Sequence, residues 1–137
     1  MATLRFVSEE EATGRTREIY EELKGSLGIV PNIYRALANN EHILETFWEN
    51  RKRIMDQGTL DPAIKEWLAW ATVAINNAKF GVDTHTARLK KMGYTDEQIV
   101  EALAVINYFI GISTVINGLG MVNDTNRETL AALAADA

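Results

Sequence analysis

The 137-residue chain contains no cysteine. This absence excludes disulfides, thiolate metal sites, thiol nucleophiles and any dithiol redox cycle. Only two histidines occur, so a histidine acid–base site has few candidates. The net charge is −5, and the densest basic cluster is only Arg51, Lys52 and Arg53. Because a nucleic-acid partner requires a concentrated basic face, we expect none.

Targeting and membrane signals are also weak. The first residues lack the basic end and apolar core of a signal peptide, so we expect a cytoplasmic protein. No charged residue lies between Glu101 and Asp124, a gap long enough to suggest a membrane span. Asn107, Asn117 and three glycines interrupt this segment. We therefore expect it to break into pieces, with a separate helix after Gly111, and to lie in the core or at a subunit interface rather than in a membrane.

Alternating, strand-like patterns are absent, and only two prolines interrupt the helical periodicity. The hydrophobic content of 47% suits a packed core. We predict one all-α domain over residues 1–137, with about six to seven helices and short connections. The predicted helices cover about 8–26, a short helix with Pro31 in its first turn, 41–57, a helix from 61, 80–92, a helix from 95, and 124–137.

Three local signals predict helix starts. Ser8 with Glu11, and Thr95 with Gln98, have the spacing of a capping box. In Asp61-Pro62 the aspartate can accept a backbone N–H, and proline at the first helical position gives up only an unpaired one. The helix that begins there carries two tryptophans.

Glu66 and His85 are the candidate proton-transfer pair. Glu66 follows the start of its helix and lies beside Trp67 and Trp70. It is either a surface carboxylate that favours the helix dipole or a carboxylate in an apolar pocket that exchanges a proton. His85 is either a hydrogen-bonded structural residue or a general acid–base. In antiparallel helices, we expect the two to meet only through an oblique crossing or a neighbouring chain. The other histidine, His42, looks like a surface residue.

Other chemistries are less well supported. Asp83 could join Glu66 and His85 as metal ligands, but the helical zinc spacing of two histidines is missing. We therefore expect no metal and no cofactor. The tryptophans could line an apolar ligand pocket, although aromatics at helical spacing are more often plain core.

The stretch from Glu66 to His85 resembles the core of the carboxymuconolactone decarboxylase / alkylhydroperoxidase D-like (AhpD-like) family. Its thiol members carry Glu, then Cys-x-x-Cys, then His four residues beyond the second cysteine. Here Glu66 stands twelve residues before Ala78, and His85 stands four after Gly81, so Ala78 and Gly81 occupy the cysteine positions. The upstream run GIVPNIYRALANNEHILETFW and the run from Gly93 through Ile99 extend the resemblance over nearly the whole chain.

The resemblance implies an all-α fold assembled as a homo-oligomer, commonly a trimer or hexamer. It implies Glu66 and His85 as catalytic residues, with Trp70, Asn77 and Phe80 around the substrate. Peroxide reduction in the thiol members requires a nucleophilic sulfur, which Ala78 and Gly81 cannot supply. The glycine also suggests a cavity where a sulfur would lie.

Three functions stay open. The first is a thiol-independent lyase, decarboxylase-like, or isomerase acting on a small organic acid or lactone. The second is a non-catalytic oligomeric binding protein that kept the fold. The third, and least favoured, is peroxidase activity as in the thiol members of the family. Neither the substrate nor the pathway can be read from the residues.

Overall fold

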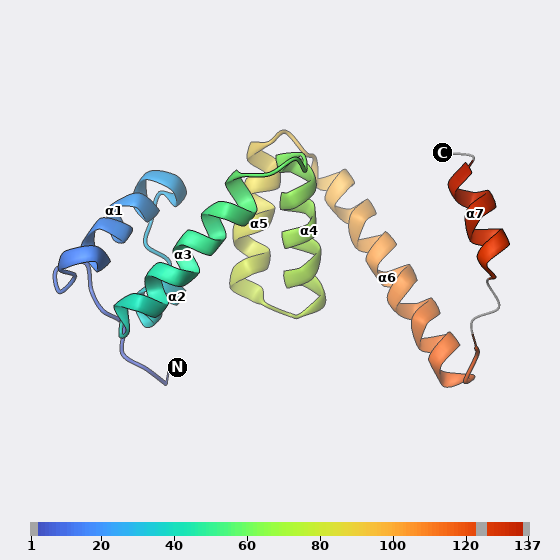
Figure 1. The fold of residues 1–137 in the computed structure, drawn as a ribbon, viewed down its shortest axis with the longest axis horizontal. Helices are drawn as coiled ribbons and strands as arrows, with labels where there is room; N and C mark the ends of the chain where they lie inside the picture. Colours follow the sequence, from blue (N-terminus) through green and yellow to red (C-terminus); the bar gives the residue numbers. More distant parts are fainter. Residues whose placement is uncertain (1–2, 123–125, 136–137) are drawn as a thin grey trace. The chain divides into compact units, whose positions relative to one another are not determined.

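The computed structural model describes residues 3–122 and 126–135. In this part of the chain every regular element is a helix (Figure 1), which confirms the all-α prediction. The helices are α1 (Gly14–Leu27), α2 (Asn32–Leu37), α3 (Glu41–Asp56), α4 (Pro62–Ile75), α5 (Lys79–Lys91), α6 (Asp96–Gly118) and α7 (Arg127–Ala135). The chain divides into two compact units, Met1–Lys65 and Glu66–Ala137, with the boundary inside α4. A single domain over residues 1–137 stays a prediction.

The first unit is built on one face of α1. Its inward residues recur at helical spacing and pack against Leu44 and Trp48 of α3. The hydroxyl of Tyr20 donates to the carbonyl of Val7 at 3.0 Å, which ties the N-terminal arm to this core. The buried set is Ala12, Ile19, Tyr20, Leu23, Val30, Leu44 and Trp48.

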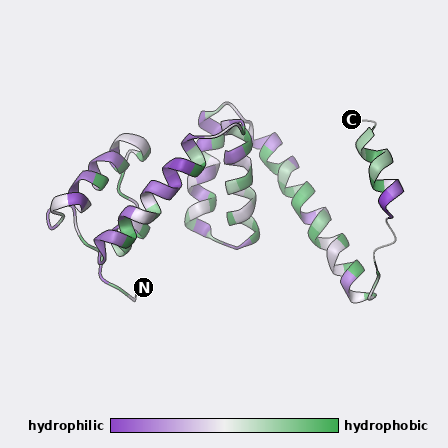
Figure 2. Ribbon diagram, viewed as in Figure 1, coloured by the Kyte–Doolittle hydropathy of each residue, from purple (hydrophilic) through white to green (hydrophobic). Residues whose placement is uncertain are grey.

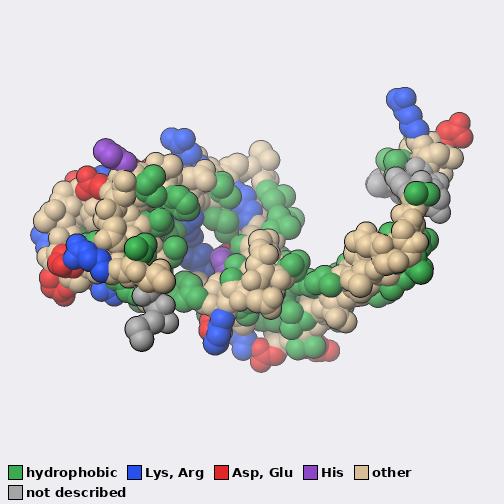
Figure 3. All heavy atoms as spheres, turned by 90° about the horizontal axis from the view of Figure 1, so that it is seen from below, with side chains coloured by type: hydrophobic (Ala, Val, Ile, Leu, Met, Phe, Trp, Pro, Cys, Tyr) green, Lys and Arg blue, Asp and Glu red, His purple; other side chains and the backbone are tan. Residues whose placement is uncertain are grey.

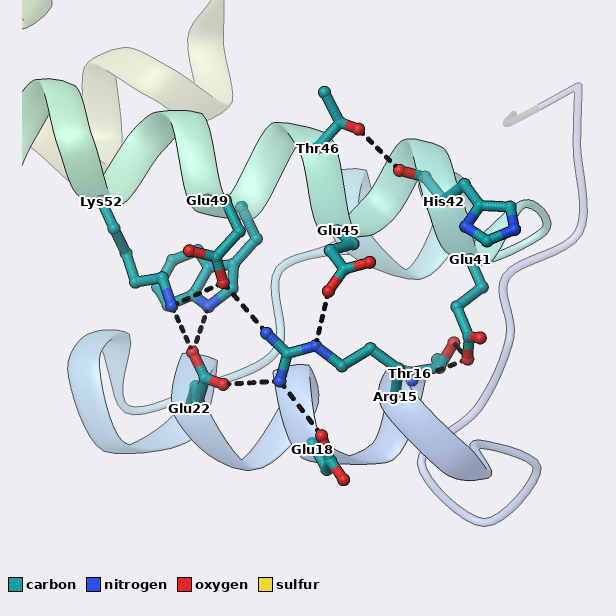
Figure 4. Close-up of polar contacts among 11 residues, drawn as sticks. Arg15, Thr16, Glu18, Glu22, Glu41, His42, Glu45, Thr46, Glu49 and Lys52 are labelled. Atoms are coloured by element: carbon teal, nitrogen blue, oxygen red, sulfur yellow. Dashed lines mark hydrogen bonds and ion pairs between the residues drawn. The ribbon is translucent and has the colours of Figure 1, made fainter.

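A network of charges joins α1 to α3 (Figure 4). Arg15 makes ion pairs of 2.9–3.1 Å with four carboxylates, those of Glu18, Glu22, Glu45 and Glu49. Glu22 also accepts from the ammonium of Lys52 at 2.8 Å and from the indole N–H of Trp48 at 2.7 Å. These hydrogen bonds, the one from Lys52 first, lower the pKa of Glu22 to about 2. The network therefore favours the ionised form of that carboxylate.

The N-terminal helix begins later than predicted. Ser8 and Glu11 do form the reciprocal pair of hydrogen bonds, at 2.9 and 3.2 Å. They close only one turn, and α1 starts at Gly14, whose φ of 52° lies in the left-handed region. The positive φ separates the turn from the helix, so the capping-box spacing located a turn rather than the start of α1.

The second unit is built on α4, α5 and the first half of α6. Asp61 accepts from the backbone N–H of Ala63 at 2.8 Å, and Thr95 with Gln98 forms a complete capping box. Both starts agree with the sequence prediction. The core contains Trp70, Leu89 and Ile99, with Trp67, Ala71, Tyr94, Ala102 and Ile106 packed against it.

Helix α6 is continuous, which corrects the expected break at Gly111. One glycine costs a helix only about 1 kcal/mol relative to alanine, and no proline adds to that cost. Most of the helix beyond its first turns lies outside the core, because only 6% of its most apolar stretch, with a mean hydropathy of 2.0, is buried. Figure 2 colours much of this helix as hydrophobic, and Figure 3 shows hydrophobic side chains on the surface of the molecule. Its length and composition would allow a membrane span, which is weak evidence on its own.

The last helix was predicted over 124–137. Helix α7 covers Arg127–Ala135, and residues 124–125 and 136–137 lie outside the described part of the chain. The side chain of Asn126 accepts from the backbone N–H of Thr129 at 2.9 Å, a typical helix-start contact.

Candidate functional site

Glu66 is buried within the second unit. It is the fifth residue of α4 and only 3% exposed, so the alternative of a surface carboxylate is wrong. Trp70, one turn further along the same stripe, is 2% exposed and belongs to the core. Glu66 is buried because it lies on the inward stripe of α4, where carboxylates are rarely placed without a polar partner.

That partner is His85. Its Nδ1 lies 2.6 Å from Oε1 of Glu66, and its side chain is 21% exposed. Helices α4 and α5 are antiparallel neighbours, since Gly81 approaches Val73 near their connection and His85 reaches Glu66 further away. The pair meets within one chain, and no neighbouring chain is required.

The contact orients the imidazole. An ionised carboxylate only accepts, so a neutral His85 donates its proton from Nδ1 to Glu66. This leaves the lone pair of Nε2 as the basic atom of the ring. Among residues 3–122 and 126–135, the His85 side chain has no hydrogen bond other than the one to Glu66. Nε2 is therefore free to exchange a proton with a bound molecule.

Arg88 is a third member that the sequence analysis missed. Its Nη1 lies 3.7 Å from Oε2 of Glu66, and its side chain is 26% exposed. Arg88 follows His85 by three residues on α5, which places both on one face of the helix. That spacing was the available signal, but three-residue spacing between polar residues is too common in helices to single out a site.

The residues predicted around the substrate lie in different environments. Trp70 is core, and its indole N–H donates to the hydroxyl of Thr86 at 2.9 Å. Asn77 is exposed in the α4–α5 connection with a φ of 54°, a conformation that asparagine tolerates better than most residues. Phe80 is 55% exposed and, five residues before His85, projects about 140° away around the helix. Their contact with a substrate stays a prediction.

The two family cysteine positions lie at the start of α5. Ala78 is exposed and immediately precedes the helix, and Gly81 is half-buried in its first turn. A Cβ on Gly81 would lie 2.7 Å from Cγ1 and 2.9 Å from Cβ of Val73. The expected cavity at Gly81 is therefore wrong, because the Val73 side chain fills that space.

The metal alternative finds no support in the described residues. No group of three or more His, Cys, Asp or Glu side chains there could hold a metal ion. Asp83, the third predicted ligand, pairs with Lys79 at 2.9 Å.

Comparisons with known proteins identify the family and the fold. A model of the carboxymuconolactone decarboxylase family matches residues 41–124, a segment that contains Glu66, His85 and Arg88. The crystal structure of the alkylhydroperoxidase AhpD core from Rhodospirillum rubrum ATCC 11170 is similar to this chain, with a TM-score of 0.81 and 28% identity over 90% of this chain and 95% of that one. No curated protein matches. Since the family model covers well over half of the sequence, the chain belongs to the carboxymuconolactone decarboxylase family.

Proposed function

We propose that this protein is a thiol-independent lyase or isomerase that moves a proton on a small organic acid or lactone. The observation that carries the proposal is the 2.6 Å contact between His85 Nδ1 and the buried carboxylate of Glu66. A buried acid that orients a partly exposed imidazole is an arrangement suited to general acid–base catalysis. His85 would exchange the proton through Nε2, and Glu66 would stabilise the imidazolium.

Two reactions fit these roles. In a decarboxylation, the bond between the carbon and its carboxylate breaks, carbon dioxide leaves, and the electron pair is delocalised into an adjacent carbonyl. Protonated His85 then supplies the proton that the carbon requires. In an isomerisation, neutral His85 removes a proton next to a carbonyl and returns it to another position. Neither reaction needs a sulfur nucleophile or an external oxidant.

Peroxidase activity by the dithiol route is not proposed. The similar solved structure is described as an alkylhydroperoxidase core, but this chain has no cysteine, and Ala78 and Gly81 stand at the corresponding positions. The alternative is a non-catalytic binding protein that kept the fold.

The test is proton exchange on candidate substrates. A panel of keto acids and lactones is incubated in D₂O with the protein, and hydrogen–deuterium exchange and carbon dioxide release are followed by NMR. We expect His85→Gln to lose roughly a hundredfold or more of the activity. His42→Gln is the matched control, because His42 is an exposed histidine of the first unit, and it should retain full activity. Equal rates in wild type and His85→Gln would contradict the proposal, and a folded wild type inert on the whole panel would favour the non-catalytic alternative.

We further propose that the protein acts as a homo-oligomer, a trimer or hexamer by family resemblance. Soluble monomers rarely expose contiguous apolar patches as long as α6. An open groove of about 530 Å³ between the end of α4 and α6 is mostly apolar, and its lining includes Ile75, Val105, Ile106, Phe109 and Ile110. A second copy of the chain would cover this surface.

The cytoplasmic location stays a prediction.

A further inference from the structure

We propose that Arg88 is a carboxylate-binding residue, which holds the acid group of a small organic acid beside Nε2 of His85. The inference rests on the proposed function of the Glu66–His85 pair and adds to it the residue that would select an acidic substrate. In the part of the chain that the structure describes, the guanidinium of Arg88 has Glu66 as its neighbour and has unused hydrogen-bond donors.

The guanidinium of Arg88 is close to Glu66 without being hydrogen-bonded to it. Its Nη1 lies 3.7 Å from Oε2, beyond the 2.7–3.2 Å usual for such hydrogen bonds. Within the described residues, Arg88 has no other side-chain partner. Arg15 shows the contrast, because its guanidinium is satisfied by four carboxylates at 2.9–3.1 Å.

The nitrogens of Arg88 that lack a hydrogen bond are not fully buried. In the described part of the chain, the one fully buried side-chain nitrogen or oxygen without a hydrogen bond belongs to Arg51. The nitrogens of Arg88 are therefore accessible, in agreement with its 26% exposed side chain. A planar guanidinium with free donors binds a carboxylate through two parallel hydrogen bonds.

The placement of Arg88 gives the bound acid a defined neighbour. Arg88 lies about 60° around α5 from His85, one turn along the helix. Glu66 contacts both, with Oε1 toward His85 and Oε2 toward Arg88. An acid group on Arg88 would thus lie on the same side of α5 as the imidazole that exchanges the proton.

A carboxylate fits the local charge better than phosphate does. Two other α5 cations are already paired, Lys79 with Asp83 and Lys90 with Asp96. Arg88 is the α5 cation that lies next to Glu66, so it would have to balance both Glu66 and a ligand. The buried Glu66 carboxylate repels a dianion more strongly than a monoanion. Lys79 is an exposed cation nine residues before Arg88, on the opposite side of α5, and serves as a control.

The experiment is an acetate titration followed through the two histidine rings. Imidazole carbon–proton signals are recorded for the full chain at constant ionic strength, with sodium acetate replacing sodium chloride. We expect a saturable shift of the His85 signal and none of the His42 signal. Methyl acetate, which lacks the charge, should shift neither. Inorganic phosphate should bind more weakly than acetate, so that the His85 signal shifts only at higher phosphate concentrations.

Variants separate ligand binding from a purely structural role. Arg88→Lys keeps a positive charge beside Glu66 but loses the planar fork, and should weaken acetate binding about tenfold. Lys79→Gln should bind acetate as the wild type does. Equal acetate binding by Arg88→Lys and wild type would overturn the proposal. So would a wild type whose His85 signal does not saturate, or shifts no more than that of His42, a result that requires no variant to fold.

The two proposals fail in different ways. Saturable acetate binding without proton exchange on any substrate would leave Arg88 as an acid-binding residue and reject the catalytic function. Proton exchange that depends on His85 but not on Arg88, in a protein that does not bind acetate, would reject the role of Arg88 alone.

Discussion

Replacing Gly81 should destabilise the protein, because Val73 occupies the space of the missing side chain. An added Cβ would lie 2.7 Å from one Val73 methyl and 2.9 Å from the Val73 Cβ, distances that real side chains essentially never show. Overpacking of this kind costs about 1–3 kcal/mol. The better helix propensity of alanine returns about 0.5–1 kcal/mol. We therefore expect Gly81→Ala to lose about 0–2.5 kcal/mol of unfolding free energy.

The partner substitution provides the control. Val73→Ala removes the methyl at 2.7 Å but keeps the Cβ at 2.9 Å, so Gly81→Ala should cost less in that background than in the wild type, a favourable coupling of about 0.5 kcal/mol or more. Gly25→Ala is the matched control, since Gly25 is a helical glycine of α1 with nothing within 4 Å of its added Cβ. That substitution should stabilise the protein slightly.

The assay is equilibrium unfolding in urea for the wild type, the three single variants and the double variant. Additive effects of Gly81→Ala and Val73→Ala would refute the packing argument, as would a Gly81→Ala protein as stable as Gly25→Ala. The result also bears on the family cysteines, because a thiol at position 81 would require the same displacement of Val73, whereas Ala78 is exposed.

Two further predictions concern charge in the first unit and apolar surface in the second. The hydrogen bond from Lys52 lowers the pKa of Glu22 from 4.5 to about 2, so Glu22 stabilises the folded state above about pH 4.5 and this contribution is lost as pH falls toward 2. The stability difference between wild type and Glu22→Gln, from urea unfolding, should therefore shrink over that window. Phe109, 61% exposed on α6, should be covered by a second copy, so Phe109→Glu should lower the mass measured by light scattering, whereas Glu97→Gln at the start of α6 should not.

Each of these has a contradicting outcome. A Glu22 difference that stays constant from pH 6 to pH 2 would mean that its ion pairs do not favour the ionised carboxylate. A wild type that is monomeric at micromolar concentration, or a Phe109→Glu variant with unchanged mass, would mean that α6 does not form a subunit interface.

Local signals predicted much of the fold because they act through neighbouring residues. Asp61-Pro62 and Thr95 with Gln98 start helices where expected. The same kind of signal failed at Ser8, where the left-handed Gly14 separates a capped turn from α1. The break predicted at Gly111 was also wrong, because one glycine is too weak to end an apolar helix.

The sequence pointed to two residues of the candidate site but not to their contact. The positions of Glu66 and His85 follow from the family spacing, yet their contact depends on how α4 packs against α5, which no local pattern encodes. Arg88 enters only once that packing is known. Val73 of α4 fills the space beside Gly81 of α5. The sequence does not show that these two residues pack together, so it could not exclude the expected cavity.

The most direct test of the account is the position of the proton on the neutral ring of His85. Nitrogen-15 NMR above the titration of the imidazole distinguishes the two tautomers, and His42 provides an internal reference. The account predicts a proton on Nδ1 of His85, held by Glu66, and loss of this preference in Glu66→Ala. A wild-type His85 that carries its proton on Nε2 would contradict the role of the pair in proton transfer. So would a proton on Nδ1 that stays there in Glu66→Ala.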